Sequence, residues 1–169
     1  MNIKINTEYK ENDIVSSEHF FRKNERDLIP KEVVLSVDED GFIFSQENIK
    51  NLHFDNSGRY FENPESSYKQ INKVISDILQ GKPIKPVVIN TKGNVLDGQH
   101  RMCAFNVLGI KNIPVFKSLM NDTVFDNLST RRRKFDISFE EDFFKKEDLE
   151  NNIDYQNFIK KNNKKYKPS

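Results

Sequence analysis

The chain has 169 residues, of which 36% are hydrophobic and 31% are charged, and its 27 basic and 26 acidic side chains give a formal net charge of +1. This length predicts one main domain with a short accessory segment and excludes a multidomain enzyme within the chain. Its single cysteine excludes an internal disulfide, and no run approaches the roughly 20 apolar residues that cross a bilayer, so we expect a cytoplasmic protein without membrane association.

The first part of the chain predicts a β-hairpin and a loop. Residues before about 30 are polar and irregular. A β-branched run at 32–37 and an apolar run at 42–44 flank Asp38 to Gly41, which has the composition of a tight turn. The stretch 51–64 is rich in Asn, Asp, Ser and Gly without a hydrophobic period, and predicts a loop.

The middle of the chain begins with an amphipathic helix. Apolar residues recur at helical spacing over 67–79, so one face of this helix is predicted to be buried. Gly81 has the position of a glycine that ends a helix, and Pro83 prevents its continuation.

Three strands and a second helix follow. Residues 86–90 and 95–96 predict two strands joined by a turn, and residues 102–108 predict a helix that ends at Gly109. Residues 113–116 predict the next strand. The order helix, strand, strand, helix, strand predicts an α+β fold, a small mixed β-sheet with packed helices.

The C-terminal part separates acidic from basic residues. Residues 135–154 contain eight acids and two lysines, whereas 155–169 contain five lysines and no acid. We predict a main domain over 1–120, a helical extension over 121–155 whose helix reaches Ile159 at most, and a basic disordered tail over 156–169.

The strongest functional signal is the run Asp97-Gly98-Gln99-His100-Arg101, which lies where a predicted strand passes into a predicted helix. Helix N-termini carry unpaired N–H groups and the positive end of the helix dipole, so they bind anions, phosphates above all. Gly98 allows a ligand to approach the backbone closely. His100 and Arg101 supply further donors, and Asp97 is a candidate Mg²⁺ ligand or proton acceptor.

Each of these residues also has an ordinary structural interpretation. Asp97 is equally expected as the N-cap of the following helix. Arg101 would then form a surface ion pair, and His100 a structural hydrogen bond. Four such residues in succession at an anion-binding helix terminus favour the functional interpretation.

The segments Lys85 to Asn90 and Gly93 to Phe116, which include Val-Leu-Asp-Gly-Gln-His-Arg, resemble the ParB/sulfiredoxin superfamily, whose hallmark is a D-G-x-H-R or G-x-R-R junction. The resemblance spans about 50 residues, from Gln70 to Ser118. Free-serine-kinase-like proteins and ParB-like ATPases or nucleases are the members most similar in this motif. Sulfiredoxins carry their catalytic cysteine at the position of Gln99, which argues against sulfinic-acid repair.

The resemblance implies a domain that binds ATP or CTP with Mg²⁺ and acts as a phosphotransferase or NTP hydrolase. It implies Asp97 and His100 as catalytic residues and Asp97 as the Mg²⁺ ligand. The phosphates would be bound by Gly98, Gln99, His100 and Arg101. A serine kinase also needs an acidic base on an early strand, and spacing does not select one from Glu32, Asp38 and Glu39.

A basic cluster supports an alternative function. Its guanidinium and ammonium groups would contact phosphates or a DNA backbone, or would lie in a solvated loop; the cluster comprises Arg131, Arg132, Arg133 and Lys134. The alternative is a DNA-binding accessory protein or ParB-like nuclease, encoded by a phage or mobile element as the Asn- and Lys-rich composition suggests. A third hypothesis is a catalytically inactive adaptor that binds a protein partner. The oligomeric state is left open.

Overall fold

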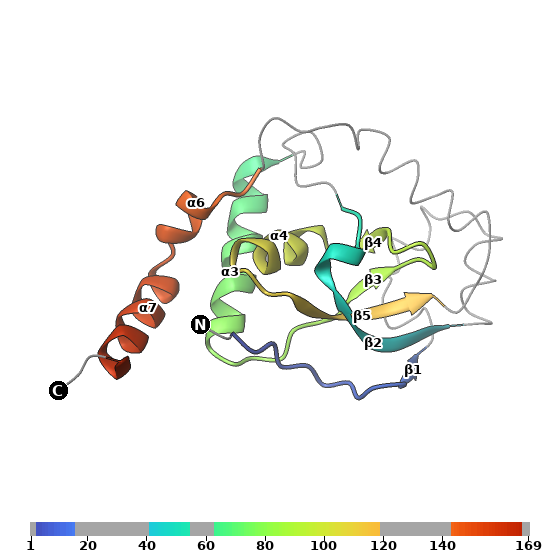
Figure 1. The fold of residues 1–169 in the computed structure, drawn as a ribbon. Helices are drawn as coiled ribbons and strands as arrows, with labels where there is room; N and C mark the ends of the chain where they lie inside the picture. Colours follow the sequence, from blue (N-terminus) through green and yellow to red (C-terminus); the bar gives the residue numbers. More distant parts are fainter. Residues whose placement is uncertain (1–2, 16–40, 55–62, 119–142, 167–169) are drawn as a thin grey trace.

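A five-stranded mixed sheet forms the centre of the described chain (Figure 1). The structure is a computed structural model that describes residues 3–15, 41–54, 63–118 and 143–166. The strand order is β1-β2-β5-β3-β4. The strands are β1 (Ile14–Val15), β2 (Phe42–Asn48), β3 (Val87–Ile89), β4 (Val95–Asp97) and β5 (Asn112–Ser118).

Hydrogen bonding makes β5 the central strand of this sheet. It pairs antiparallel with β2 from Phe42 opposite Ser118 to Asn48 opposite Asn112. On its other side it pairs parallel with β3, and β3 pairs antiparallel with β4. Because parallel strands need a crossover connection, the chain between β3 and β5 passes through β4 and helix α4. This crossover contains the Asp97–Arg101 junction.

Helix α3 (Pro64–Leu79) has clear start and stop signals. Asn63 is its N-cap and accepts a hydrogen bond from the Ser66 N–H, and proline at the first helical position suits a start. Its buried face carries Ile71, Ile75 and Ile78, as the helical periodicity predicts. The helix ends before Gly81, whose φ of 76° is a left-handed conformation that favours glycine.

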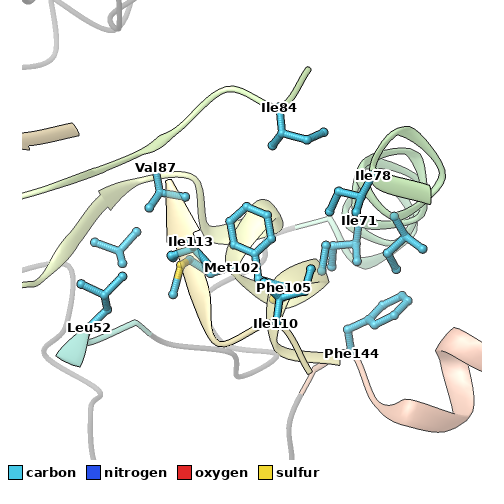
Figure 2. Packing of buried hydrophobic residues seen from close by; sticks show 14 of the residues in the cluster. Leu52, Ile71, Ile78, Ile84, Val87, Met102, Phe105, Ile110, Ile113 and Phe144 are labelled. Atoms are coloured by element: carbon cyan, nitrogen blue, oxygen red, sulfur yellow. The ribbon is translucent and has the colours of Figure 1, made fainter. Parts of the chain in front are cut away.

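The hydrophobic core lies between α3, α4 (Gln99–Val107) and the sheet (Figure 2). Met102 and Phe105 of α4 are fully buried there, between the isoleucines of α3 and the sheet residues Val87 and Ile113. The predicted helices and strands of residues 67–116 are confirmed, and so is the α+β fold class. Within the described parts of the chain, no helix has the length and apolarity to cross a membrane.

The C-terminal segment belongs to the same core. Helices α6 (Lys146–Glu150) and α7 (Ile153–Tyr166) follow Phe144, which is 1% exposed and lies in the core cluster with Leu149. The Tyr68 hydroxyl donates to the Phe143 carbonyl oxygen at 3.0 Å. The segment that begins at Phe143 therefore packs on α3, and in the described residues it is not a separate unit.

Three details differ from the sequence predictions. Helix α7 continues to Tyr166, beyond the predicted end at Ile159, so the part of the tail up to Tyr166 is helical. Lysine has a good helix propensity, and lysines near a helix C-terminus interact favourably with its dipole. Strand β2 extends to Asn48 instead of ending at residue 44, because pairing with β5 supplies backbone hydrogen bonds to its polar residues. Strand β1 was not predicted, and the predicted strand at 32–37 lies outside the described residues.

Candidate functional site

The strand-to-helix junction is a tight turn at Gly98. β4 ends at Asp97, Gly98 has a φ of 110°, and α4 begins at Gln99. A Cβ on Gly98 would lie 2.6 Å from Cγ1 of Val87, so this position requires glycine both for its conformation and for the space. The N-cap of α4 is Gly98 rather than Asp97, and α4 begins without a side-chain cap. The expectation that Asp97 caps the helix is wrong for this reason.

Arg101 links the junction by hydrogen bonds to the segment that precedes β3. Its Nη1 donates to the carbonyl oxygens of Lys85 and Pro86, each at 2.7 Å. Its Nη2 lies 3.3 Å from Oδ2 of Asp97, and the Arg101 side chain is only 14% exposed. The ion pair between Arg101 and Asp97 is therefore not the surface ion pair that the structural interpretation of the sequence expected. Its hydrogen bonds fix the relative position of β3 and the start of α4.

His100 joins the first turns of the two central helices. Its Nε2 lies 3.0 Å from Oγ of Ser67, which is in the first turn of α3 and is buried. Burial lowers the pKa of His100, the Arg101 guanidinium lowers it further, and the Asp97 carboxylate partly opposes them. The imidazole is consequently neutral near pH 7 and acts there as a hydrogen-bonding group rather than a cation.

Ser67 is a site residue that sequence reasoning missed. The periodicity places it at the start of a helix, and nothing in a single sequence pairs it with a histidine 33 positions further on. Serine is common near the N-terminus of a helix, so the presence of Ser67 there did not indicate a functional role.

The two other junction residues differ in exposure and contacts. Gln99 donates from its Nε2 to the Val95 carbonyl oxygen at 3.2 Å, so its side chain turns back along β4. The Asp97 side chain is 34% exposed, the larger exposure of its pair with Arg101. Asp97 is thus the junction carboxylate that solvent reaches.

A metal ion at the junction would have one protein carboxylate. No group of three or more His, Cys, Asp or Glu residues converges within the described ranges. Mg²⁺ commonly takes one or two carboxylates, with substrate phosphates and water as its other ligands. The single carboxylate of Asp97 fits an ion delivered with a nucleotide, and it does not fit a resident all-protein metal site.

Several predicted residues lie outside the described parts of the chain. They are the basic cluster Arg131, Arg132, Arg133 and Lys134, and the early acids Glu32, Asp38 and Glu39. The roles predicted for them stay predictions.

The altered pKa of His100 predicts how stability depends on pH. Because the pKa is lower in the folded state, the unfolded chain takes up a proton first as the pH falls below about 6.5. The free energy of unfolding should therefore decrease from there down to the folded pKa, and this contribution should be constant above about pH 6.5. Urea denaturation at about pH 7.5 and about pH 5.5 measures the change.

The control for this prediction is His100→Asn, which keeps a polar side chain but does not titrate. Its loss of stability between the two pH values should be smaller than that of the unchanged chain. An equal loss in both would show that other groups cause the pH dependence.

Comparison with known proteins yields a partial structural likeness. No family model matches the sequence, and no curated protein matches it. Among solved structures, the chain is similar to a Pnob8-like ParB-N domain, with 15% sequence identity and a TM-score of 0.39. The match covers 56% of this chain and 37% of that chain, so this chain spans well under half of the matched protein.

The fold is an α+β domain in which a mixed five-stranded sheet and the helices α3 and α4 position the Asp97–Arg101 junction. With this sequence identity and TM-score, the likeness indicates no ligand and no reaction for the junction.

Proposed function

We propose that this domain binds a nucleoside triphosphate, ATP or CTP, with its phosphates over the Asp97–Arg101 junction. The observation that carries this proposal is the start of α4, which has glycine as its N-cap and no side-chain cap. Helix N-termini of this kind, with glycine beside them, are common phosphate sites because the backbone can approach the anion closely.

A second helix start adds to the positive potential at the junction. The 3.0 Å contact between His100 and Ser67 brings the first turns of α4 and α3 together, so the positive ends of two helix dipoles are adjacent. The start of α3 is capped by the Asn63 side chain, whereas α4 has no such cap. This difference supports α4 as the helix that receives the anion.

Different roles follow for the junction residues. The first turn of α4, from Gly98 to His100, would contact the phosphates through its backbone. Asp97 would hold a Mg²⁺ ion that accompanies the nucleotide and reduces the negative charge of the phosphates. Arg101 was predicted to bind phosphate directly. Its guanidinium already contacts the carbonyl oxygens of Lys85 and Pro86 and the carboxylate of Asp97. We therefore assign Arg101 the role of holding the junction in position rather than of binding phosphate.

The proposed reaction is phosphoryl transfer to a hydroxyl group or to water. The attacking oxygen forms a bond to the γ-phosphorus, the bond from that phosphorus to the β-bridging oxygen breaks, and the nucleoside diphosphate leaves. The proton of the attacking group would pass to the neutral imidazole of His100, because the Asp97 carboxylate would be occupied by Mg²⁺ and by Arg101.

Isothermal titration calorimetry with the four ribonucleoside triphosphates and their diphosphates, with and without Mg²⁺, tests this function. We expect saturable binding of at least one triphosphate, strengthened by Mg²⁺. His100→Ala should weaken it by about tenfold, because the variant loses the contact with Ser67 that fixes the first turn of α4, whose backbone would bind the phosphates.

The matched control is His53→Ala, which removes an exposed histidine outside the junction. It should bind the nucleotide like the unchanged chain. If no nucleotide binds, or if both histidine variants weaken binding equally, the junction is not the site.

A further inference from the structure

The hydroxyl group of Ser67 is a buried polar group with one hydrogen-bonding partner. Ser67 lies near the start of α3 and is only 5% exposed. Its Oγ lies 3.0 Å from Nε2 of His100, and within the described ranges of the chain this is its one hydrogen-bonding contact. Because buried polar groups are nearly always hydrogen-bonded, the contact with His100 has to satisfy this hydroxyl group.

The burial of this group determines the direction of the hydrogen bond. A serine hydroxyl has one hydrogen to donate and an oxygen that can accept. Serine in a helix can also donate to the carbonyl oxygen four residues earlier, but here that oxygen, of Asn63, accepts from the Ser67 N–H at 3.0 Å. If His100 donated to Ser67, the hydroxyl hydrogen would be buried without an acceptor. We conclude that the hydroxyl group donates to Nε2 of His100.

This direction fixes where the imidazole carries its own hydrogen. Burial lowers the pKa of His100, so the ring is neutral near pH 7. A neutral imidazole has one nitrogen that donates and one that accepts, and the hydrogen bond at one nitrogen sets the state of the other. With Nε2 as the acceptor, the ring hydrogen must be on Nδ1.

We propose that Ser67 is a positioning residue, whose hydroxyl group donates to Nε2 of His100 and holds the ring as the tautomer with its hydrogen on Nδ1. The tautomer determines what each nitrogen can do. Nδ1 would donate to a phosphate oxygen and Nε2 would take up the proton of the attacking group, a division of roles that rests on the proposed function. The serine hydroxyl can then rotate and accept from the protonated ring, so the contact holds the ring in both states.

NMR spectroscopy of the full-length chain tests the tautomer directly. Long-range proton–nitrogen correlation spectra distinguish a protonated from an unprotonated ring nitrogen. They are recorded at about pH 8, where an imidazole with a lowered pKa is neutral. The chain has three histidines, and the signals that disappear in His100→Asn belong to His100. We expect its Nδ1 to be protonated and its Nε2 to be unprotonated.

Replacing Ser67 tests the cause of this tautomer. Ser67→Ala removes the donor, so the two nitrogen signals of His100 should move towards each other or exchange places. Ser67→Thr keeps a hydroxyl group and should leave them unchanged. The matched control is Ser66→Ala, one position earlier, where the hydroxyl oxygen accepts from Nε2 of Gln70 at 3.2 Å. It should also leave the signals unchanged, and circular dichroism checks that every variant is folded.

Two outcomes would overturn the positioning role of Ser67. One is an unchanged chain in which Nε2 of His100 carries the hydrogen, a result that needs no variant. The other is a spectrum of Ser67→Ala in which His100 keeps the Nδ1 tautomer.

The proposed function fails separately from this role. The tautomer is measured without nucleotide, so a chain that binds no triphosphate in the calorimetric test overturns the proposed function and leaves the spectrum of His100 interpretable. Where a triphosphate binds, its addition with Mg²⁺ should change the Nδ1 signal more than the Nε2 signal. An unchanged Nδ1 signal at saturation would contradict the phosphate contact.

Discussion

Replacing Arg101 by alanine is expected to lower the free energy of unfolding by about 3 kcal/mol. The change removes the donors that satisfy the carbonyl oxygens of Lys85 and Pro86 and leaves Asp97 without its partner. Because the Arg101 side chain is only 14% exposed, water replaces these hydrogen bonds poorly. Urea denaturation followed by circular dichroism measures the loss.

Two controls distinguish the effect of the hydrogen bonds of Arg101 from the effect of its positive charge. Arg101→Lys keeps the charge, but an ammonium group cannot reproduce the planar guanidinium, so most of the loss should remain. Lys82→Ala removes a cation whose nitrogen lies 3.7 Å from Asp77 at the surface, and its effect should be below about 1 kcal/mol. Arg101→Ala with a similarly small effect would contradict the positioning role.

Replacing Gly98 by alanine is expected to lower the free energy of unfolding by about 3 kcal/mol and to abolish nucleotide binding. The left-handed backbone conformation costs an alanine about 1–2 kcal/mol, and the clash of its Cβ with Val87 adds about 1–3 kcal/mol. Denaturation and calorimetry on the same variant measure the two effects.

Gly109→Ala is the matched control for this substitution. Gly109 also has a positive φ, of 69°, but a Cβ there meets no atom within 4 Å. Its cost should therefore be the conformational part alone, about 1–2 kcal/mol, without an effect on nucleotide binding. Equal costs for the two variants would show that contact with Val87 does not matter.

The sequence predicted the central elements because their signals are local. The periodicity of α3, its terminal Gly81, and the turn between β3 and β4 all depend on residues close in sequence. The position of the Asp97–Arg101 run at a strand-to-helix junction was predicted for the same reason and is confirmed.

Contacts over long sequence distances could not be predicted in this way. Arg101 carries a charge that suits phosphate, and only the fold shows its guanidinium against the carbonyl oxygens of Lys85 and Pro86. Likewise, Ser67 meets His100 only because α3 and α4 pack together. The polar residues of β2 gave no strand signal, since their pairing depends on β5, more than 60 residues later in the chain.

The burial of Phe144 and Leu149 in the core has a consequence for biosynthesis. These side chains fill the cluster formed by α3 and α4, yet they follow β5 by more than 20 residues. During translation, the earlier helices emerge from the ribosome before the residues that cover them, so their apolar surfaces remain exposed to chaperones and to other nascent chains. A fragment that ends at Ser118 should accordingly aggregate, and the native state should form only after the last sixth of the chain begins to emerge.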